Sequence, residues 1–303
     1  MNSFEFSATP ITRVTTLSEK YGCNIVMKRD DLFEHGGGGS KARMLQYILY
    51  QAKRQDADYI VTAGGPYSNF NRALALLCKK HGFNMRLVLY DKNSHLEKES
   101  MNRRILDLCK VEIVSCEPAT VVSQVNKEIK KLKEQNKKPY YIWGGGKSNE
   151  GVEAYKDAYN EIMGPENPDY IFTAVGTGTT FSGLLAGNHN NSNKATIIGV
   201  SVARTAPVAS DVIAEIFDAY DPSLSMSQCN GKILDDYLMG GYGCTDEDLT
   251  SFINTFIEHE GIIVDSIYVG KALFGMSEYI NKHRNKFKDK SVVFLNTGGL
   301  YNF

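Results

Sequence analysis

The order of hydrophobic and polar positions changes its period repeatedly along the chain. Short runs rich in β-branched and aromatic residues alternate with longer segments whose apolar residues recur at helical spacing. A strand is expected in each of eight runs, at residues 24–28, 59–62, 85–90, 111–115, 140–143, 170–175, 196–202 and 292–295. Helices are expected between them, for example after position 41 and after position 244. This alternation predicts an α/β protein whose sheets are mostly parallel.

A glycine-rich stretch, WGGGKSNEG at residues 143–151, interrupts this alternation. It separates a first block of strands and helices from a second α/β block, so we expect a domain junction near it. In the first block, Ser94 and Glu97 have the spacing of a capping box. They predict that a helix begins shortly before Met101.

A second glycine run, Gly36 to Gly39, has the composition of a flexible spacer between fused domains. The other interpretation is a functional loop that brings Lys41 into a site where backbone must approach a ligand closely. A spacer separates units that fold alone, yet only 35 residues precede Gly36 and they contain one clear strand. The functional loop is therefore favoured.

Lys41 lies at the start of a predicted helix, where the helix dipole disfavours a cation by roughly 0.3–1 kcal/mol. If its side chain points into a site, the same field lowers the pKa of the amine. The side chain then supplies the neutral amine that a Schiff base requires. The alternative is a solvated lysine on the first helical turn.

The stretch AVGTGTTFSGLLAG, residues 174–187, places a turn between an apolar strand and a helix. Free backbone N–H groups, the helix dipole and the hydroxyls of Thr177, Thr179 and Thr180 suit a phosphate group. No lysine follows as in a P-loop, and Phe181 replaces the third glycine of the dinucleotide fingerprint. A single phosphate, as in pyridoxal phosphate, fits better than ATP or NAD. A simple tight turn remains the alternative.

Two more turns follow predicted strands. Ser68 and Asn69 stand at a helix start, where they could bind a substrate carboxylate or where Ser68 could merely cap the helix. Thr297 follows the last strand and precedes two glycines. Turns at the carboxyl ends of parallel strands are where open α/β sheets bind ligands, so we expect several of these turns to form one site.

Composition and charge exclude several classes of partner. The chain has 303 residues, 42% of them hydrophobic, and a formal net charge of −1 with scattered basic residues. A small-molecule partner is therefore expected, and neither nucleic acid nor a membrane. The N-terminus lacks the pattern of a signal peptide, and the six cysteines show no close-spaced pair, which indicates reduced core thiols in the cytoplasm. The six histidines form no cluster, so no metal is expected.

Taken together, the motifs resemble the fold-type II pyridoxal-phosphate enzymes, in the branch of D-cysteine desulfhydrase and 1-aminocyclopropane-1-carboxylate deaminase. The matching motifs, in chain order, are TPITRV, KRDDL, GGSKARMLQY, AGGPYSNFNR, GGGKSNEGVEAY, AVGTGTT, GGYG, YVGKALFGM and NTGG. The resemblance implies a fold like that of the tryptophan synthase β subunit, with two domains that each have an open, mostly parallel sheet flanked by helices. It implies a larger cofactor-binding domain (residues 1–44 and 148–303), a smaller inserted domain (residues 45–147) and a homodimer.

The resemblance also implies roles for individual residues. Those implied to bind the cofactor are Lys41 as the Schiff-base lysine, Asn69 at the ring hydroxyl, Gly176, Thr177, Gly178, Thr179 and Thr180 at the phosphate, and Thr297 at the pyridine nitrogen. Those implied to be catalytic are Lys41, Ser68, Tyr242 and Tyr268. The glycine run before Lys41 is then the bend that brings this lysine to the cofactor.

The residue that follows Tyr268 favours one of the possible reactions. Deaminases of this group resemble YEGK where this chain has Tyr268 and then Val269. Without that acid, a hydroxyl such as that of Thr297 leaves the pyridine nitrogen largely unprotonated and the cofactor a weaker electron sink. We therefore expect α,β-elimination from a small, D-cysteine-like amino acid, giving a 2-oxo acid, ammonia and sulfide. The alternatives are cyclopropane deamination, β-replacement on another amino acid, and cofactor binding without turnover.

This chain also departs from the usual motifs of the group. Ser40 precedes the lysine, Tyr67 and Phe70 flank Ser68 and Asn69, and Asn296 replaces the usual histidine before Thr-Gly-Gly. Tyr67 and Phe70 would make a carboxylate pocket bulkier and less polar. These departures concern the choice of substrate rather than the fold or the cofactor.

Overall fold

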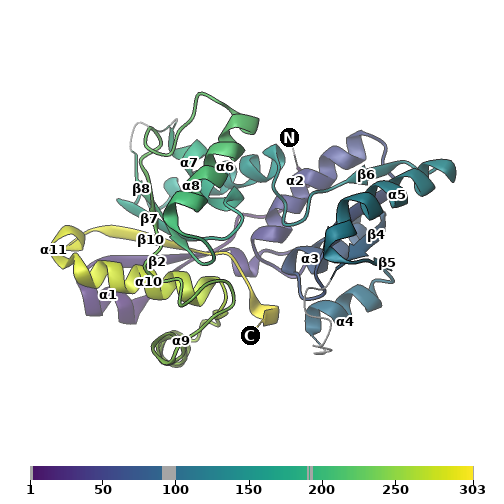
Figure 1. The fold of residues 1–303 in the computed structure, drawn as a ribbon. Coiled ribbons are helices and arrows are strands. Elements are labelled where there is room, and N and C mark those ends of the chain that lie inside the picture. Colours follow the sequence, from purple (N-terminus) through teal and green to yellow (C-terminus); the bar gives the residue numbers. More distant parts are fainter. Residues whose placement is uncertain (1–2, 91–99, 190, 192–193, 303) are drawn as a thin grey trace. The chain divides into compact units, whose positions relative to one another are not determined.

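The structure is a computed structural model that describes residues 3–90, 100–189, 191 and 194–302. Contacts divide the chain into two compact units (Figure 1). Unit 1 comprises residues 1–7 and 33–148, and unit 2 comprises residues 8–32 and 149–303. The boundary expected between residues 44 and 45 would cut helix α2 (Ser40–Arg54), which is continuous and packs on helix α3. Residues 33–44 therefore group with unit 1.

Unit 1 is built on a four-stranded sheet in the order β5-β4-β3-β6, in which all neighbouring strands are parallel. Its strands are β3 (Tyr59–Gly64), β4 (Asn84–Leu89), β5 (Glu112–Ser115) and β6 (Pro139–Tyr141). Its helices are α2, α3 (Asn69–His81), α4 (Met101–Leu108) and α5 (Val121–Glu134), with a 3₁₀ turn η2 (Pro118–Thr120). Val125 and Leu132 of α5 pack against Val61 and Val88 of the sheet, so α5 covers one face of it.

Local signals define the ends of the helices in unit 1. Helix α3 ends at Gly82, which adopts the left-handed conformation that favours glycine. Helix α4 begins after Ser100, whose hydroxyl accepts a hydrogen bond from the Arg103 N–H. The predicted capping box of Ser94 and Glu97 lies outside the described residues.

Unit 2 contains a six-stranded sheet in the order β1-β2-β10-β7-β8-β9. Its strands are β1 (Ile11–Arg13), β2 (Asn24–Arg29), β7 (Tyr170–Val175), β8 (Thr196–Ser201), β9 (Gly231–Leu234) and β10 (Ser291–Asn296). Only β1 pairs antiparallel among these described strands. The sequence did not predict the edge strands β1 and β9, because each has at most four residues and no buried stretch long enough to show a period.

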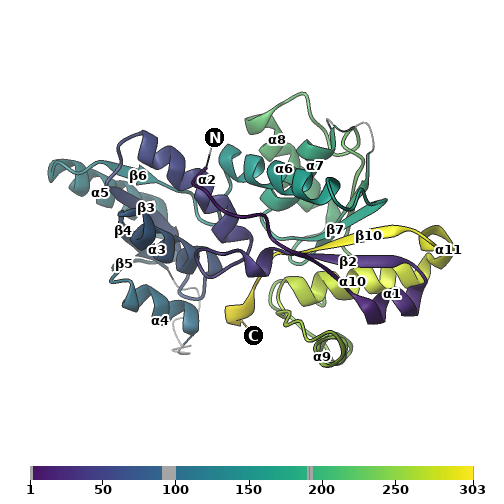
Figure 2. The ribbon, with the colours of Figure 1, turned by 180° about the vertical axis from the view of Figure 1, so that it is seen from behind.

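Helices cover both faces of the unit 2 sheet. They are α1 (Thr15–Tyr21), α6 (Asn149–Met163), α7 (Thr179–His189), α8 (Ala206–Tyr220), α9 (Glu247–Glu260), α10 (Val269–Lys282) and α11 (Arg284–Phe287), with 3₁₀ turns η1 (Asp30–Leu32) and η3 (Leu300–Asn302). Figures 1 and 2 show α6, α7 and α8 on one face of this sheet and α1, α9 and α10 on the other. Helix α7 lies very close to α6, since a Cβ at Gly187 would approach the Tyr159 side chain to 2.7 Å. This contact fixes the helix that follows β7.

The helices and the cysteines were each the subject of an expectation from the sequence. Within the described residues, each helix is either too short or too polar to cross a bilayer. All six cysteines are free thiols, and Cys23, Cys78, Cys109 and Cys229 are buried as expected. Cys244 is exposed instead, because it belongs to the loop before α9 rather than to an apolar helix or strand.

Candidate active site

The glycine run of unit 1 is a packed loop and not a spacer. Gly36 to Gly39 all have positive φ angles, between 58° and 89°, which residues with a side chain rarely adopt. A Cβ at Gly36 would approach the Leu77 side chain of α3 to 3.2 Å. The Arg72 guanidinium of α3 donates to the Gly37 carbonyl at 2.6 Å and to the Gly38 carbonyl at 3.4 Å. The loop is therefore held against α3 along its length.

Lys41 is the second residue of α2, directly after this loop. Its amine donates a hydrogen bond to the Gly145 carbonyl at 2.9 Å, so it is not a solvated lysine on a fraying turn. Desolvation by the surrounding protein lowers the pKa of the amine to about 8. Gly146, next to that carbonyl, lies against Met44 of α2 and Phe70 of α3. Unit 1 thus brings the lysine and the start of α3 to the same turn.

Arg43 shows how α2 tolerates a second cation in its first turn. Its guanidinium is fully buried and lies over the rings of Phe6 and Phe33, 5.4 Å and 5.3 Å from their centroids. Cation–π contacts of this kind are strongest where water is excluded. Arg43 therefore serves the packing of unit 1.

Ser68 caps α3, as the simpler interpretation of the sequence proposed. Its hydroxyl oxygen accepts a hydrogen bond from the Asn71 N–H at 3.3 Å, which leaves its O–H free to donate. Asn102 of α4 holds the residues on either side of Ser68. Its Nδ2 donates to the Tyr67 carbonyl at 2.9 Å and to the Asn69 Oδ1 at 3.2 Å.

In unit 2, the turn from Gly176 to Thr180 connects β7 to α7 and leaves the first N–H groups of α7 without carbonyl partners inside the helix. Gly178 has a φ of 88°. The hydroxyls of Thr179 and Ser182 are buried, and neither has a hydrogen-bond partner in the part of the chain that the structure describes. Buried polar groups are rarely left unpaired, so these donors fit a bound anion. Arg204 donates to the Gly176 carbonyl.

Tyr268 and Tyr242 lie next to this turn as a pair. Their hydroxyls are 2.7 Å apart, and a Cβ at Gly176 would be 3.4 Å from the Tyr268 ring. Burial and the neighbouring hydroxyl of Tyr242 raise the pKa of Tyr268. The buried Lys271 amine donates to the carbonyls of Leu238 and Gly241, at 3.0 Å and 2.9 Å, and so holds the loop that carries Tyr242.

Asp265 joins Tyr268 to the segment after β10. Its carboxylate accepts hydrogen bonds from the N–H groups of Ile267, Tyr268 and Val269 at 3.1, 2.9 and 2.9 Å. A Cβ at Gly299 would lie 2.5 Å from the same carboxylate. Burial raises the pKa of Asp265 to about 6, against the hydrogen bonds, which lower it.

Thr297 lies in this same segment, directly after β10. The Asn296 Oδ1 accepts a hydrogen bond from the Gly298 N–H at 3.0 Å, which forms a tight turn around Thr297. Asn296, which stands where the group usually has histidine, is therefore a turn-forming residue here. Unit 2 thus gathers the Gly176–Thr180 turn, both tyrosines and the Thr297 turn.

Sequence reasoning missed the residues that hold these loops, namely Arg72, Asn102, Arg204, Asp265 and Lys271. Four of them bind backbone carbonyls 28 or more residues away in the chain, which no local pattern reveals. Only Asp265 carries a local signal, because an acid shortly before a helix is a typical start signal.

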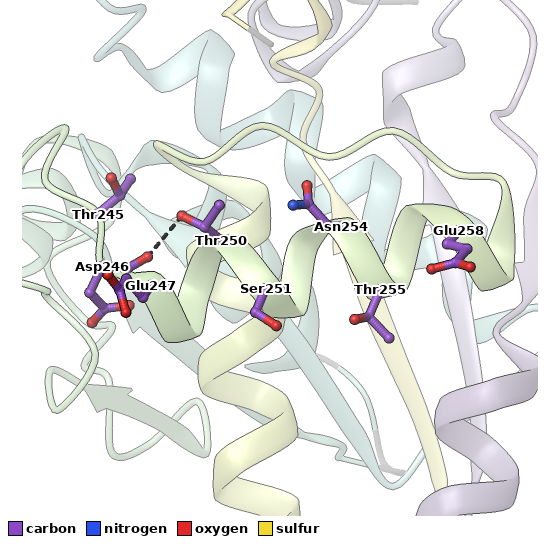
Figure 3. A pocket seen from close by; sticks show the side chains of 8 residues that line it. All are labelled: Thr245, Asp246, Glu247, Thr250, Ser251, Asn254, Thr255 and Glu258. Atoms are coloured by element: carbon purple, nitrogen blue, oxygen red, sulfur yellow. Dashed lines mark hydrogen bonds between the residues drawn. The ribbon is translucent and has the colours of Figure 1, made fainter.

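A surface hollow of about 550 Å³ also lies in unit 2. Figure 3 shows that its side chains come from α9 and the residues just before it. The Thr250 hydroxyl there donates to the Asp246 carbonyl, and the Asp246 side chain caps α9 by accepting from the Leu249 N–H. These polar groups serve the helix, and none of the predicted site residues lines the hollow.

The fold and the two residue groups define a class of enzyme. Residues 3–298 match the family described as pyridoxal-phosphate dependent enzyme, and the chain belongs to this family. Its cofactor is pyridoxal phosphate. The donors of the Gly176–Thr180 turn and the low pKa of Lys41 fit the phosphate and the aldehyde of that cofactor, respectively.

Particular relatives narrow the class. The chain is 32% identical to a D-cysteine desulfhydrase of Yersinia pestis (strain Pestoides F), over 97% of this chain and 92% of the relative. It is also 32% identical to a putative 1-aminocyclopropane-1-carboxylate deaminase of Thermotoga maritima, over 97% of this chain and 94% of that one. The solved structure of an ACC deaminase homologue, 28% identical, matches with a TM-score of 0.84 over 100% of this chain and 93% of that one. The expected family, fold class and cofactor are confirmed.

Proposed function

We propose that this protein is a carbon–sulfur lyase that eliminates the β substituent of D-cysteine or a similar small amino acid. The products are a 2-oxo acid, ammonia and, from D-cysteine, sulfide. Relatives named D-cysteine desulfhydrase support this reaction. The relative named putative 1-aminocyclopropane-1-carboxylate deaminase supports deamination of that cyclopropane as the second candidate reaction.

The observation that favours elimination is the side chain that follows Tyr268. Val269 is fully buried at the start of α10, and its N–H donates to Asp265. The Asp265 carboxylate is occupied by three N–H groups of the same segment. An apolar residue at this position provides no proton for the pyridine nitrogen, which suits the loss of a good leaving group better than ring opening.

The cofactor supplies an aldehyde that links to amines and a ring that withdraws electrons from the substrate Cα. For cofactor binding, we assign the aldehyde to Lys41, the ring hydroxyl to Asn69, the phosphate to the Gly176–Thr180 turn and the pyridine nitrogen to Thr297. The buried donors of Thr179 and Ser182 support the phosphate assignment. The surroundings of Lys41, which lower its pKa to about 8, support the first assignment.

For catalysis, the Lys41 amine takes the proton from the substrate Cα. Its hydrogen bond to the Gly145 carbonyl orients the amine, and its pKa of about 8 leaves a useful neutral fraction near neutral pH. The Ser68 O–H donates to the substrate carboxylate while its oxygen caps α3. Tyr268, whose raised pKa keeps it protonated, donates a proton to the leaving sulfur, either directly or through the Tyr242 hydroxyl.

We further propose that the enzyme works in the cytoplasm as a homodimer, on a small amino acid. The free thiols support a reducing compartment. The dimer is an expectation from the family, and sedimentation of the purified protein tests it.

A panel of amino acids tests the function. Purified protein is given D-cysteine, L-cysteine, D-serine and 1-aminocyclopropane-1-carboxylate, and sulfide and 2-oxo acids are measured. We expect sulfide and pyruvate in equal amounts from D-cysteine, and little 2-oxobutanoate from the cyclopropane. Efficient 2-oxobutanoate formation would contradict the proposal in favour of deamination. Sulfide without an equal amount of 2-oxo acid would indicate β-replacement.

A further inference from the structure

We propose that Asn102 is a positioning residue that fixes the orientation of the Asn69 carboxamide, so that Asn69 offers N–H donors to the cofactor ring. This inference rests on the proposed function, in which Asn69 binds the ring hydroxyl. Asn102 itself touches neither cofactor nor substrate in this proposal. Its effect passes through Asn69.

The position of Asn102 suits this role. It is the second residue of α4, which Ser100 caps, and its side chain is fully buried. From there its Nδ2 reaches the Tyr67 carbonyl and the Asn69 Oδ1, at 2.9 Å and 3.2 Å. All these residues belong to unit 1.

The hydrogen bond to Tyr67 decides which way both amides face. A backbone carbonyl can only accept, so the atom of Asn102 that faces it must be the nitrogen. That same nitrogen faces Asn69, so the Asn69 atom beside it must be the acceptor, Oδ1. Because O and N lie on opposite sides of a carboxamide, the Asn69 Nδ2 is turned away from Asn102. The chain of hydrogen bonds therefore specifies an arrangement that an isolated asparagine would not keep.

This arrangement matters because the ring hydroxyl of the cofactor ionises. Hydrogen bonds to the charged form of a group favour it, so an N–H donor lowers the pKa of the ring oxygen. A flipped Asn69 would instead place a carbonyl oxygen beside the negative oxygen. The flipped amide raises that pKa and weakens cofactor binding.

The test uses Asn102→Asp, which has the same shape but lacks the donors. Apoprotein is titrated with pyridoxal phosphate to obtain a dissociation constant, and the absorption of the bound cofactor is followed against pH. We expect the dissociation constant to rise about 10- to 100-fold, since one hydrogen bond to a charged group is lost. We expect the pH midpoint of the absorption change to rise by about one unit or more.

A double-mutant comparison separates positioning from a general structural effect. In an Asn69→Ala background, Asn102→Ala should shift neither quantity further, because it adds no charge and the group through which Asn102 acts is gone. With Asn69 present, Asn102→Ala, which removes the donors without adding a charge, should give a smaller shift in the same direction and serves if the aspartate variant does not fold. Equal shifts with and without Asn69, or no shift in a folded Asn102 variant, would overturn the inference.

The control is Asn188→Asp in unit 2. Asn188 is also fully buried, and its Nδ2 donates to the carbonyls of Ala195 and Cys229 at 2.8 Å each. The substitution should lower the unfolding temperature and leave the absorption midpoint unchanged. If the natural protein takes up no cofactor, the proposed function and this inference both fail. If the natural protein takes up the cofactor normally and Asn102→Asp shifts neither the dissociation constant nor the absorption midpoint, only this inference fails.

Discussion

Unit 1 and unit 2 both hold loops with side-chain donors, but unit 2 also holds one segment with a buried acceptor. In unit 1, side-chain donors bind backbone carbonyls: Lys41 binds that of Gly145, and Arg72 binds those of Gly37 and Gly38. In unit 2, the Tyr268 segment is held by an acceptor, the Asp265 carboxylate, which binds three N–H groups. The Arg72 guanidinium keeps its protons at any physiological pH, whereas the Asp265 carboxylate, with a pKa of about 6, takes up a proton in mild acid.

Acid and base therefore act on different units. Acid protonates Asp265 and removes an acceptor from the Tyr268 segment of unit 2. Base removes a proton from Lys41 and leaves unit 1 with a neutral amine. The loop supports around Ser68 and Asn69, which are neutral amides, do not titrate. Four experiments test this contrast.

The largest effect is expected for Lys41→Ala. It removes the amine that links to the aldehyde and moves the substrate proton, so turnover should fall by about 10³-fold or more. Lys53→Ala, an exposed lysine of the same helix, should leave turnover unchanged. Treatment with borohydride followed by peptide mapping checks the linkage. Cofactor fixed at another lysine would show that Lys41 is not the residue that links to the aldehyde.

The next effect concerns the acceptor of unit 2. Asp265 uses both carboxylate oxygens, Oδ1 for Val269 and Oδ2 for Ile267 and Tyr268. Asp265→Asn keeps one oxygen and turns an NH₂ group toward N–H groups, so kcat should fall about 10- to 100-fold. In the matched change Asp246→Asn, the side chain accepts one hydrogen bond among the described residues, at Oδ1 from the Leu249 N–H, and an asparagine oxygen can accept it instead. Equal kcat losses in both variants would remove the special role of Asp265.

A smaller effect, on stability, is expected in the glycine run. Gly36→Ala and Gly22→Ala both force a residue with a side chain into a positive φ, which costs about 1–2 kcal/mol. Only at Gly36 would the new Cβ meet neighbours, the Ala42 Cβ at 3.1 Å and Leu77 at 3.2 Å. Urea unfolding should therefore show an extra loss of about 1–3 kcal/mol for Gly36→Ala. Equal losses would mean that the run is not packed.

The smallest effect is expected for the rate at which apoprotein binds the cofactor, which should change by about tenfold per pH unit. Apoprotein should capture pyridoxal phosphate faster as pH rises, with a midpoint at about 8 rather than near the 10.5 of an ordinary lysine. Since the folded state holds this proton less tightly than the unfolded chain, Lys41 also adds stability as pH rises from about 8. Stopped-flow absorbance measures the rate. If Asp265→Asn leaves this midpoint unchanged, Lys41 and Asp265 titrate independently. A midpoint near 10.5 would show that Lys41 is not desolvated.

The sequence predicted most of what local patterns encode. Residues 170–175 were predicted as a strand and form β7 with the same bounds. The turn after it, and the position of Lys41 in the first turn of a helix, followed from glycine and helix-start signals. Arg72, Asn102 and Lys271 could not be found this way, since each acts on a carbonyl more than 29 residues away. Their positions depend on packing, which one sequence does not display.

The position of β10 in the sheet determines when the sheet of unit 2 can form during synthesis. Strand β10 lies between β2 and β7, so β2 and β7 have no common sheet until β10 has left the ribosome. Unit 1 ends at residue 148 and has all of its strands long before that moment. A nascent chain therefore contains Lys41 while it still lacks the Thr297 turn that follows β10.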